Sequence, residues 1–221
     1  MSGNLIITGA SRGIGQALAE HYLTAGWKVF GCGTVKHGAY RHFSVDVTDE
    51  KAVVEMVRAV AAHGAIDGLL NNAGVASMNH LMLTPLASAQ RIMATNFFGS
   101  LLFLREVAKV MVRQKTGRIV NFTTVAVPLD LESKAAVESL TRIAAKEFGS
   151  LGLCINAVGP TPVQTDLIRA MPKEKLEALL GRQAIRRYGS FQDVANVTDF
   201  FLSPRSDFMT GQILYLGGVM P

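Results

Sequence analysis

The fold of this chain is decided by the stretch Leu5-Ile6-Ile7-Thr8-Gly9-Ala10-Ser11-Arg12-Gly13-Ile14-Gly15. Its apolar beginning is typical of a parallel strand that is covered on both faces. Gly9 permits a tight turn, Gly13 a close backbone approach to a phosphate, and Gly15 close packing of a helix on a strand. A helix that begins near Gly13 directs its free N–H groups and the positive end of its dipole at that phosphate. The stretch therefore predicts a dinucleotide site rather than a glycine-rich turn without a ligand.

The composition excludes several classes of protein. Apolar residues make up 49% and charged residues 18% of the 221 residues, which excludes disorder and suits a buried parallel sheet. The net charge of +5 comes without a dense Lys/Arg run, so it does not predict a nucleic-acid partner. Cys32 and Cys154 are too few and too far apart for a disulfide framework, and the histidines lack metal-ligand spacing. The chain begins without a signal-peptide pattern and has no run of about 18 apolar residues, so we expect a cytoplasmic protein without a membrane partner.

Strand and helix patterns alternate along the chain. This alternation predicts one α/β domain over residues 1–221, in which a doubly wound parallel sheet of seven strands has helices on both faces. After the first strand, we expect strands at 28–32, 40–45, 66–70, 118–122, 153–158 and 213–216. We expect helices from Gly13, from Thr48 or Asp49 to Ala61, over 96–114 and over 133–148, and an amphipathic segment over 171–180.

Further motifs follow the glycine turn in a fixed order. They are Asp46-Val47, Asn71-Asn72-Ala73-Gly74, Asn96, Arg118-Ile119-Val120-Asn121 and Ser133-Lys134-Ala135-Ala136. With the glycine turn, they make the chain resemble the short-chain dehydrogenase/reductase (SDR) family from Leu5 to Gly218, especially its 3-oxoacyl-carrier-protein reductase-like members. The resemblance implies a Rossmann fold, a small-molecule carbonyl or alcohol substrate under a lid at 171–180, and a homodimer or homotetramer.

The resemblance also implies three catalytic residues. Lys134 would hold the nicotinamide ribose and place a positive charge beside a tyrosine, which lowers the pKa of a phenol. Thr124 stands where the family usually has serine, and its hydroxyl would donate to the substrate carbonyl oxygen. Asn96 would order a water that relays the proton through Lys134. Each residue also has a simpler interpretation. Lys134 could be an exposed helical lysine, Thr124 a β-forming residue at the end of a strand, and Asn96 a helix N-cap.

A larger set of residues is implied to bind the cofactor. The pair at 46–47 would hold the adenine, and the turn at 160–165 would contact the nicotinamide and the pyrophosphate. Residues 72–74 belong to the family's signature after the fourth strand. The full set is Gly9, Ser11, Arg12, Gly13, Ile14, Gly15, Asp46, Val47, Asn72, Ala73, Gly74, Lys134, Pro160, Val163 and Thr165.

The end of the second strand indicates which cofactor is preferred. NAD-selective sheets place an acid there to accept the ribose hydroxyls. That position is expected to be Cys32, which cannot do so. Arg12 in the glycine turn can pair with a 2′-phosphate, although a solvated loop residue is the alternative. The sequence therefore favours NADP(H) over NAD(H).

One departure from the family concerns the proton donor. The family has a tyrosine four residues before its lysine, but residue 130 is Asp, which is ionised at pH 7. The separation from Thr124 to Lys134 is ten residues, where the family has roughly 17. We therefore expect that a segment with the tyrosine is missing between Val127 and Ser133, most simply at Glu132–Ser133. A true deletion is the alternative.

Two functions follow from these observations. The first is an NADP(H)-dependent oxidoreductase that interconverts a ketone or 3-oxoacyl group and a secondary alcohol by hydride transfer. The second is a catalytically inactive dinucleotide-binding relative that acts as a sensor or an assembly subunit.

Overall fold

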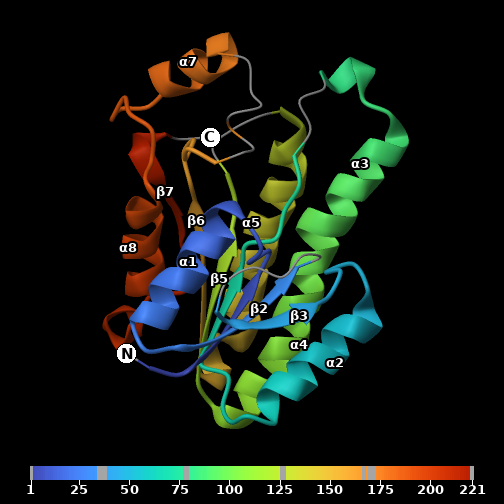
Figure 1. The fold of residues 1–221 in the computed structure, drawn as a ribbon, viewed down its shortest axis with the longest axis vertical. Coiled ribbons are helices and arrows are strands. Elements are labelled where there is room, and N and C mark those ends of the chain that lie inside the picture. The colour runs from blue at the N-terminus through green and yellow to red at the C-terminus, as the bar shows by residue number, and fades with distance from the viewer. Residues whose placement is uncertain are drawn as a thin grey trace.

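A seven-stranded parallel sheet forms the centre of the computed structural model, which describes residues 2–33, 39–76, 80–124, 128–165, 168 and 173–219 (Figure 1). The strand order is β3-β2-β1-β4-β5-β6-β7. This order confirms the expected doubly wound α/β fold. It also places a switch point between β1 and β4, where ligands of such sheets bind. The strands are β1 Asn4–Thr8, β2 Lys28–Gly33, β3 Arg41–Ser44, β4 Gly68–Asn71, β5 Gly117–Phe122, β6 Leu153–Gly159 and β7 Ile213–Tyr215.

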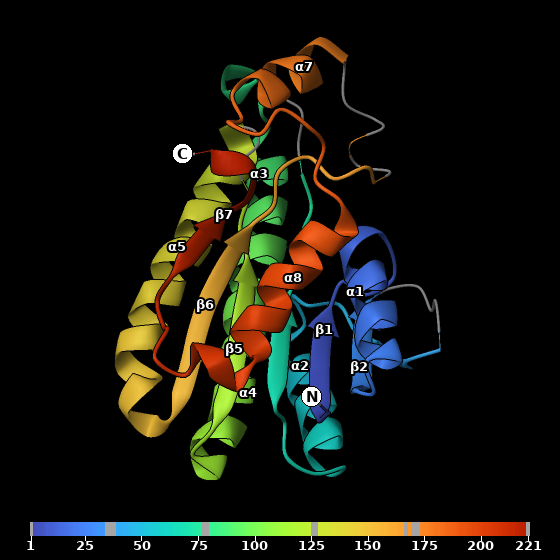
Figure 2. The same ribbon diagram turned by 90° about the vertical axis from the view of Figure 1, so that its left-hand side faces the viewer.

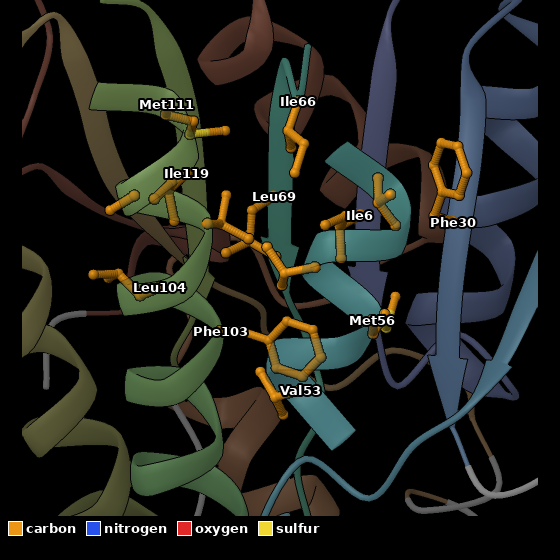
Figure 3. Close-up of a cluster of buried hydrophobic side chains, with 14 of the residues drawn as sticks. Ile6, Phe30, Val53, Met56, Ile66, Leu69, Phe103, Leu104, Met111 and Ile119 are labelled. Carbon is orange, nitrogen blue, oxygen red and sulfur yellow. The ribbon is translucent and has the colours of Figure 1, made fainter. Parts of the chain in front are cut away.

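Helices cover both faces of the sheet, because successive strand residues point to opposite sides. Ile6 packs into one apolar cluster with α2 and α4, which Figure 3 shows, while Leu5 and Ile7 pack into a second cluster. Helices α1 and α8 cover that second face (Figure 2). The helices are α1 Gly13–Thr24, α2 Glu50–Ala61, α3 Leu86–Met93, α4 Gly99–Gln114, α5 Pro128–Phe148, α7 Lys173–Gly181 and α8 Phe191–Leu202. None of those in the described part of the chain is both long and apolar enough to cross a membrane.

Two helix beginnings differ in how far the sequence predicted them. Asp49, one of the two expected caps, begins α2, and its side chain accepts a hydrogen bond from the Ala52 N–H at 3.1 Å. Helix α8 was not expected. Ser190 and Asp193 form a reciprocal capping box at its start, so the Ser-x-x-Asp pattern was the signal that could have located it.

The long helix expected from Asn96 begins earlier in the structure. Helix α3 continues through a π-helical turn, Ala94–Phe98, directly into α4. Asn96 therefore lies inside this turn, and the alternative that it is a helix N-cap is wrong. Single π-turns within helices recur at functional sites because they change the direction of one side chain.

Candidate active site

The glycine turn joins β1 to α1 at the carboxyl edge of the sheet. Gly9 and Gly13 have φ angles of 66° and 58°, which L side chains rarely adopt. A Cβ atom on Gly15 would overlap the Gly9 carbonyl oxygen and Asn72 Nδ2. Helix α1 therefore begins at Gly13, directly after a turn that only glycines can form, which is the arrangement that phosphate binding at a helix N-terminus uses.

The asparagine motif after β4 holds this turn in place. Asn72 Nδ2 donates to the carbonyl oxygens of Thr8 and Gly9 at 3.1 and 3.2 Å. The Ala73 N–H donates to Thr8 Oγ1 at 2.9 Å. The two neighbouring strands at the switch point are thus joined where a dinucleotide would cross them.

Cys32 does not lie where the cofactor-selectivity argument put it. Strand β2 ends one residue later, at Gly33, and the Cys32 side chain is fully buried in an apolar cluster. Burial raises the pKa of the Cys32 thiol to about 12. Adjacent strand residues point to opposite faces, so the side chain before the last strand residue is directed into the core. Gly33 is the last strand residue, and it supplies no carboxylate either.

Gly74 lies where the turn region and the catalytic candidates meet. A Cβ atom there would be 3.3 Å from Asn96 Oδ1 and 3.4 Å from Lys134 Nζ. Asn96 is fully buried, and its Oδ1 accepts from the Val75 N–H at 2.8 Å. Its Nδ2 donates to the Val75 carbonyl and to Ser133 Oγ, at 2.9 and 3.0 Å. The π-turn thus directs Asn96 to tie the loop after β4 to α5, beside Lys134.

Helix α5 is joined to the end of β5 by a polar stripe. Lys134 Nζ, only 8% exposed, donates to the Phe122 carbonyl at 2.8 Å. One turn later, Glu138 Oε1 accepts from Thr123 Oγ1 at 2.7 Å. Thr141 Oγ1 then accepts from the Asn121 amide at 2.9 Å. Thr124 is half-buried and directly follows residues 121–123, which these hydrogen bonds join to α5.

Sequence reasoning missed Glu138, Thr141 and the buried Asn71–Asn121 pair that continues this network. Asn71 Nδ2 donates to Asn121 Oδ1 at 3.0 Å and to the Ser100 carbonyl at 3.0 Å. The signal was present in the spacing: residues 134, 138 and 141 share one face of a helix. A polar stripe on an otherwise buried face indicates hydrogen-bonded partners.

The remaining cofactor candidates lie along the same edge. Asp46 is exposed, and its Oδ1 accepts from the N–H and Oγ1 of Thr48. Val47 is buried against Gly99. Thr165 lies over the glycine turn, since its methyl carbon would be 3.5 Å from a Cβ on Gly13. Pro160 and Val163 are buried, and Val163 forms a β-bridge with Gly189. Helix α7 overlaps the segment 171–180, for which the role of a lid stays a prediction.

The position of the proton donor is held by Asp130. Helix α5 runs without a break from Pro128 to Phe148, so Glu132 and Ser133 are consecutive residues of one helix. Residue 130 lies one turn before Lys134, on the same face of the helix. The Asp130 side chain lies outside the described residues. The expectation that a segment is missing upstream of Ser133 stays a prediction.

Three tyrosine hydroxyl groups donate hydrogen bonds to protein groups other than Lys134. Tyr22 donates to Thr198 Oγ1, Tyr40 to the Ala10 carbonyl and Tyr215 to the Glu138 carboxylate. Burial and the Glu138 carboxylate raise the pKa of Tyr215, so its hydroxyl remains a neutral donor at pH 7. None of these three replaces the tyrosine that the family has near its lysine.

Comparisons with known proteins extend over nearly the whole chain. A family model described as Enoyl-(Acyl carrier protein) reductase matches residues 9–219. The chain is 30% identical to the 3-oxoacyl-(acyl-carrier-protein) reductase FabG of Vibrio cholerae over 233 residues, which cover 97% of this chain and 96% of that protein. FabG of Escherichia coli is 29% identical with the same coverage. These alignments are longer than the 221 residues of this chain, so the relatives contain residues that have no counterpart within it.

Solved structures agree with this similarity. An aldohexose dehydrogenase from Thermoplasma acidophilum superposes with a TM-score of 0.90 and 29% identity, covering 99% of this chain and 94% of that one. A short-chain type dehydrogenase/reductase from Mycobacterium ulcerans superposes with a TM-score of 0.91 and 27% identity, covering 98% and 88%.

Proposed function

This chain belongs to the short-chain dehydrogenase/reductase family of oxidoreductases, and we propose that it uses NADP(H) to interconvert a ketone or 3-oxoacyl group and a secondary alcohol. The observation that carries the proposal is the loop after β4, where Ala73 packs against Gly9 of the glycine turn and the next residue, Gly74, lies against Asn96 and Lys134. The curated relatives act, by their names, on 3-oxoacyl groups of an acyl carrier protein.

Each candidate has a defined task in this proposal. The first N–H groups of α1 bind the pyrophosphate, and the Lys134 ammonium, held near the end of β5 by the Phe122 carbonyl, binds the nicotinamide ribose. The Thr124 hydroxyl donates to the substrate oxygen on which negative charge develops. Asn96 holds the loop after β4 against α5, so that these groups keep one geometry. The nicotinamide supplies the hydride when it is bound.

Two features support NADP(H) over NAD(H). Strand β2 ends at Gly33, where a Cβ atom would overlap Ser11 Oγ, so an acidic side chain there would require Ser11 to move. Arg12 is exposed in the same turn, where its guanidinium can reach a 2′-phosphate. The end of β2 has an arginine beside it and no carboxylate. This combination suits the 2′-phosphate of NADP(H) better than the free 2′-hydroxyl of NAD(H).

We expect Arg12→Ala to weaken NADPH binding by about 10-fold to 100-fold, because a lost charge-assisted contact costs about 1–3 kcal/mol. NADH binding should stay nearly unchanged, since NADH has no 2′-phosphate. Fluorescence titration with both cofactors at fixed ionic strength measures the two affinities. Arg113→Ala, an exposed arginine near the end of α4 at the opposite edge of the sheet, is the matched control. Equal wild-type affinity for NADPH and NADH would contradict the preference.

A second candidate function is favoured by Asp130. A chain that keeps the dinucleotide-binding residues but lacks the tyrosine proton donor fits a catalytically inactive family member. Such a protein would bind the dinucleotide and act as a sensor or an assembly subunit. Single-turnover reduction of a panel of ketones and 3-oxoacyl thioesters with NADPH separates the two. The intact mass of the expressed protein should be measured alongside. A mass equal to that of this sequence shows that no additional segment precedes Lys134. Tight NADPH binding without turnover of any substrate would favour the binding relative.

We also propose a homodimer or homotetramer. Phe98, beside α4, and Ile143, on α5, are 51% and 54% exposed, and large exposed apolar side chains indicate an interface. Light scattering at micromolar protein should give a multiple of 23.7 kDa. Ile143→Lys should lower that mass, whereas Lys51→Ala, at an exposed position on α2, should not. A monomer mass for the wild type would contradict the proposal.

A further inference from the structure

The connection between β2 and β3 is unusually short. Strand β2 ends at Gly33 and β3 begins at Arg41, although the two strands are parallel neighbours. A parallel crossover normally needs a dozen or more residues, most often with a helix that covers the sheet. Residues 34–40 are too few for this. The other crossovers of the sheet contain helices, such as α1 between β1 and β2 and α2 between β3 and β4.

Tyr40 covers the sheet at this connection. It is 3% exposed and belongs to the apolar cluster beneath α1 and α8. Its ring lies against the backbone of β2 at Gly31, where a Cβ atom would be 2.6 Å from Tyr40 Cδ2 and 2.8 Å from Ala10 Cβ. The ring therefore needs the glycine in β2, and it also contacts the glycine turn.

The hydroxyl of Tyr40 reaches the centre of the glycine turn. It donates to the Ala10 carbonyl oxygen at 3.0 Å, in a buried environment. The N–H of Ala10 donates to the Cys32 carbonyl at 3.1 Å. Both polar backbone groups of Ala10 are thus fixed, one by β2 and one by Tyr40. Ser11 and Arg12 follow directly, and α1 begins at Gly13.

We propose that Tyr40 is a positioning residue for dinucleotide binding, because its hydroxyl orients the glycine turn before the cofactor arrives. This rests on the proposed function, since it needs a dinucleotide in the turn. A turn that is already ordered loses less conformational freedom on binding, so its preorganisation appears as cofactor affinity. The same hydrogen bond also contributes to folding, so its effects on binding and on stability must be separated.

Tyr40→Phe and Tyr22→Phe make that separation. Tyr22 is buried in the same cluster, and its hydroxyl donates to Thr198 Oγ1 at 2.8 Å, between α1 and α8. Each variant keeps its ring and loses one buried hydroxyl, so both should lower the thermal midpoint to a similar degree. Tyr40→Phe should weaken NADPH binding about 5-fold to 10-fold, the equivalent of one ordinary hydrogen bond. Tyr22→Phe should leave the affinity unchanged.

Fluorescence titration with NADPH, at a temperature where all three proteins are folded, gives the affinities, and calorimetry gives the midpoints. Equal NADPH affinity of wild type and Tyr40→Phe would overturn this inference alone. An equal loss of affinity in Tyr22→Phe would also overturn it, because the effect would then be one of general stability. A wild type that binds no nicotinamide dinucleotide would instead overturn the proposed function and this inference with it.

Discussion

In a chain of this sequence, where no tyrosine lies one helical turn before Lys134, Asp130→Tyr should raise the rate of ketone reduction with NADPH by about 100-fold or more over the wild type. Helix geometry puts residue 130 one turn before Lys134 on the same face of α5, so the variant restores the tyrosine-to-lysine spacing of the family. A positioned general acid contributes about 10²-fold to 10⁴-fold. An aspartate with an ordinary pKa is ionised at pH 7 and supplies none of this, whereas a phenol beside a lysine ammonium has its pKa lowered toward the working pH.

Two variants test whether the gain comes from the phenol. Asp130→Phe has the same ring without the hydroxyl, and it should stay at the wild-type rate. Adding Lys134→Met to Asp130→Tyr should remove most of the gain, because the phenol loses its adjacent cation. Single-turnover rates at saturating NADPH measure chemistry apart from binding. A gain in Asp130→Phe equal to that in Asp130→Tyr would show that removal of the carboxylate, rather than proton transfer, caused it.

Gly15→Ala should destabilise the protein by about 3 kcal/mol or more and abolish measurable cofactor binding. The added Cβ atom would overlap the Gly9 carbonyl oxygen and Asn72 Nδ2, and it would lie 2.9 Å from the Gly9 carbonyl carbon. The Gly9 atoms are backbone, so relief requires α1 to move away from β1. That movement opens the glycine turn and breaks the Asn72 hydrogen bonds to Thr8 and Gly9.

Gly149→Ala is the matched control for this prediction. Gly149 begins the short 3-10 helix after α5, and a Cβ atom there would meet nothing within 4 Å. Its effect on the free energy of unfolding should be within about 0.5 kcal/mol. Chemical denaturation without cofactor measures both variants. A Gly15→Ala protein as stable as Gly149→Ala would contradict the assigned packing of α1 on β1.

The sequence by itself determined the sheet, most of its helices and the glycine turn. These features depend on local physical signals: apolar runs of strand length, helical periodicity, and glycines whose positions are required by steric contact. Gly9, Gly13 and Gly15 are such cases, because their φ angles or their lack of a side chain are needed within a single turn. Asn72, which follows β4, lies near the turn because parallel strands end at one edge of the sheet.

Only the tertiary structure decided which side chains complete the site. Cys32 was placed at the end of the second strand, where an acid would accept the ribose hydroxyls, because the sequence did not reveal where β2 ends. A difference of one residue reverses the face of a side chain. Asn96 was identified from its motif, but only the fold shows that the π-turn directs its side chain to Val75 and Ser133. That Asn96 orders a water stays a prediction. Tyr40 contacts Ala10 across 30 residues, and Asn71 contacts Asn121 across 50. Periodicity reports the faces of one element at a time, so hydrogen bonds between distant elements become visible only when the chain has folded.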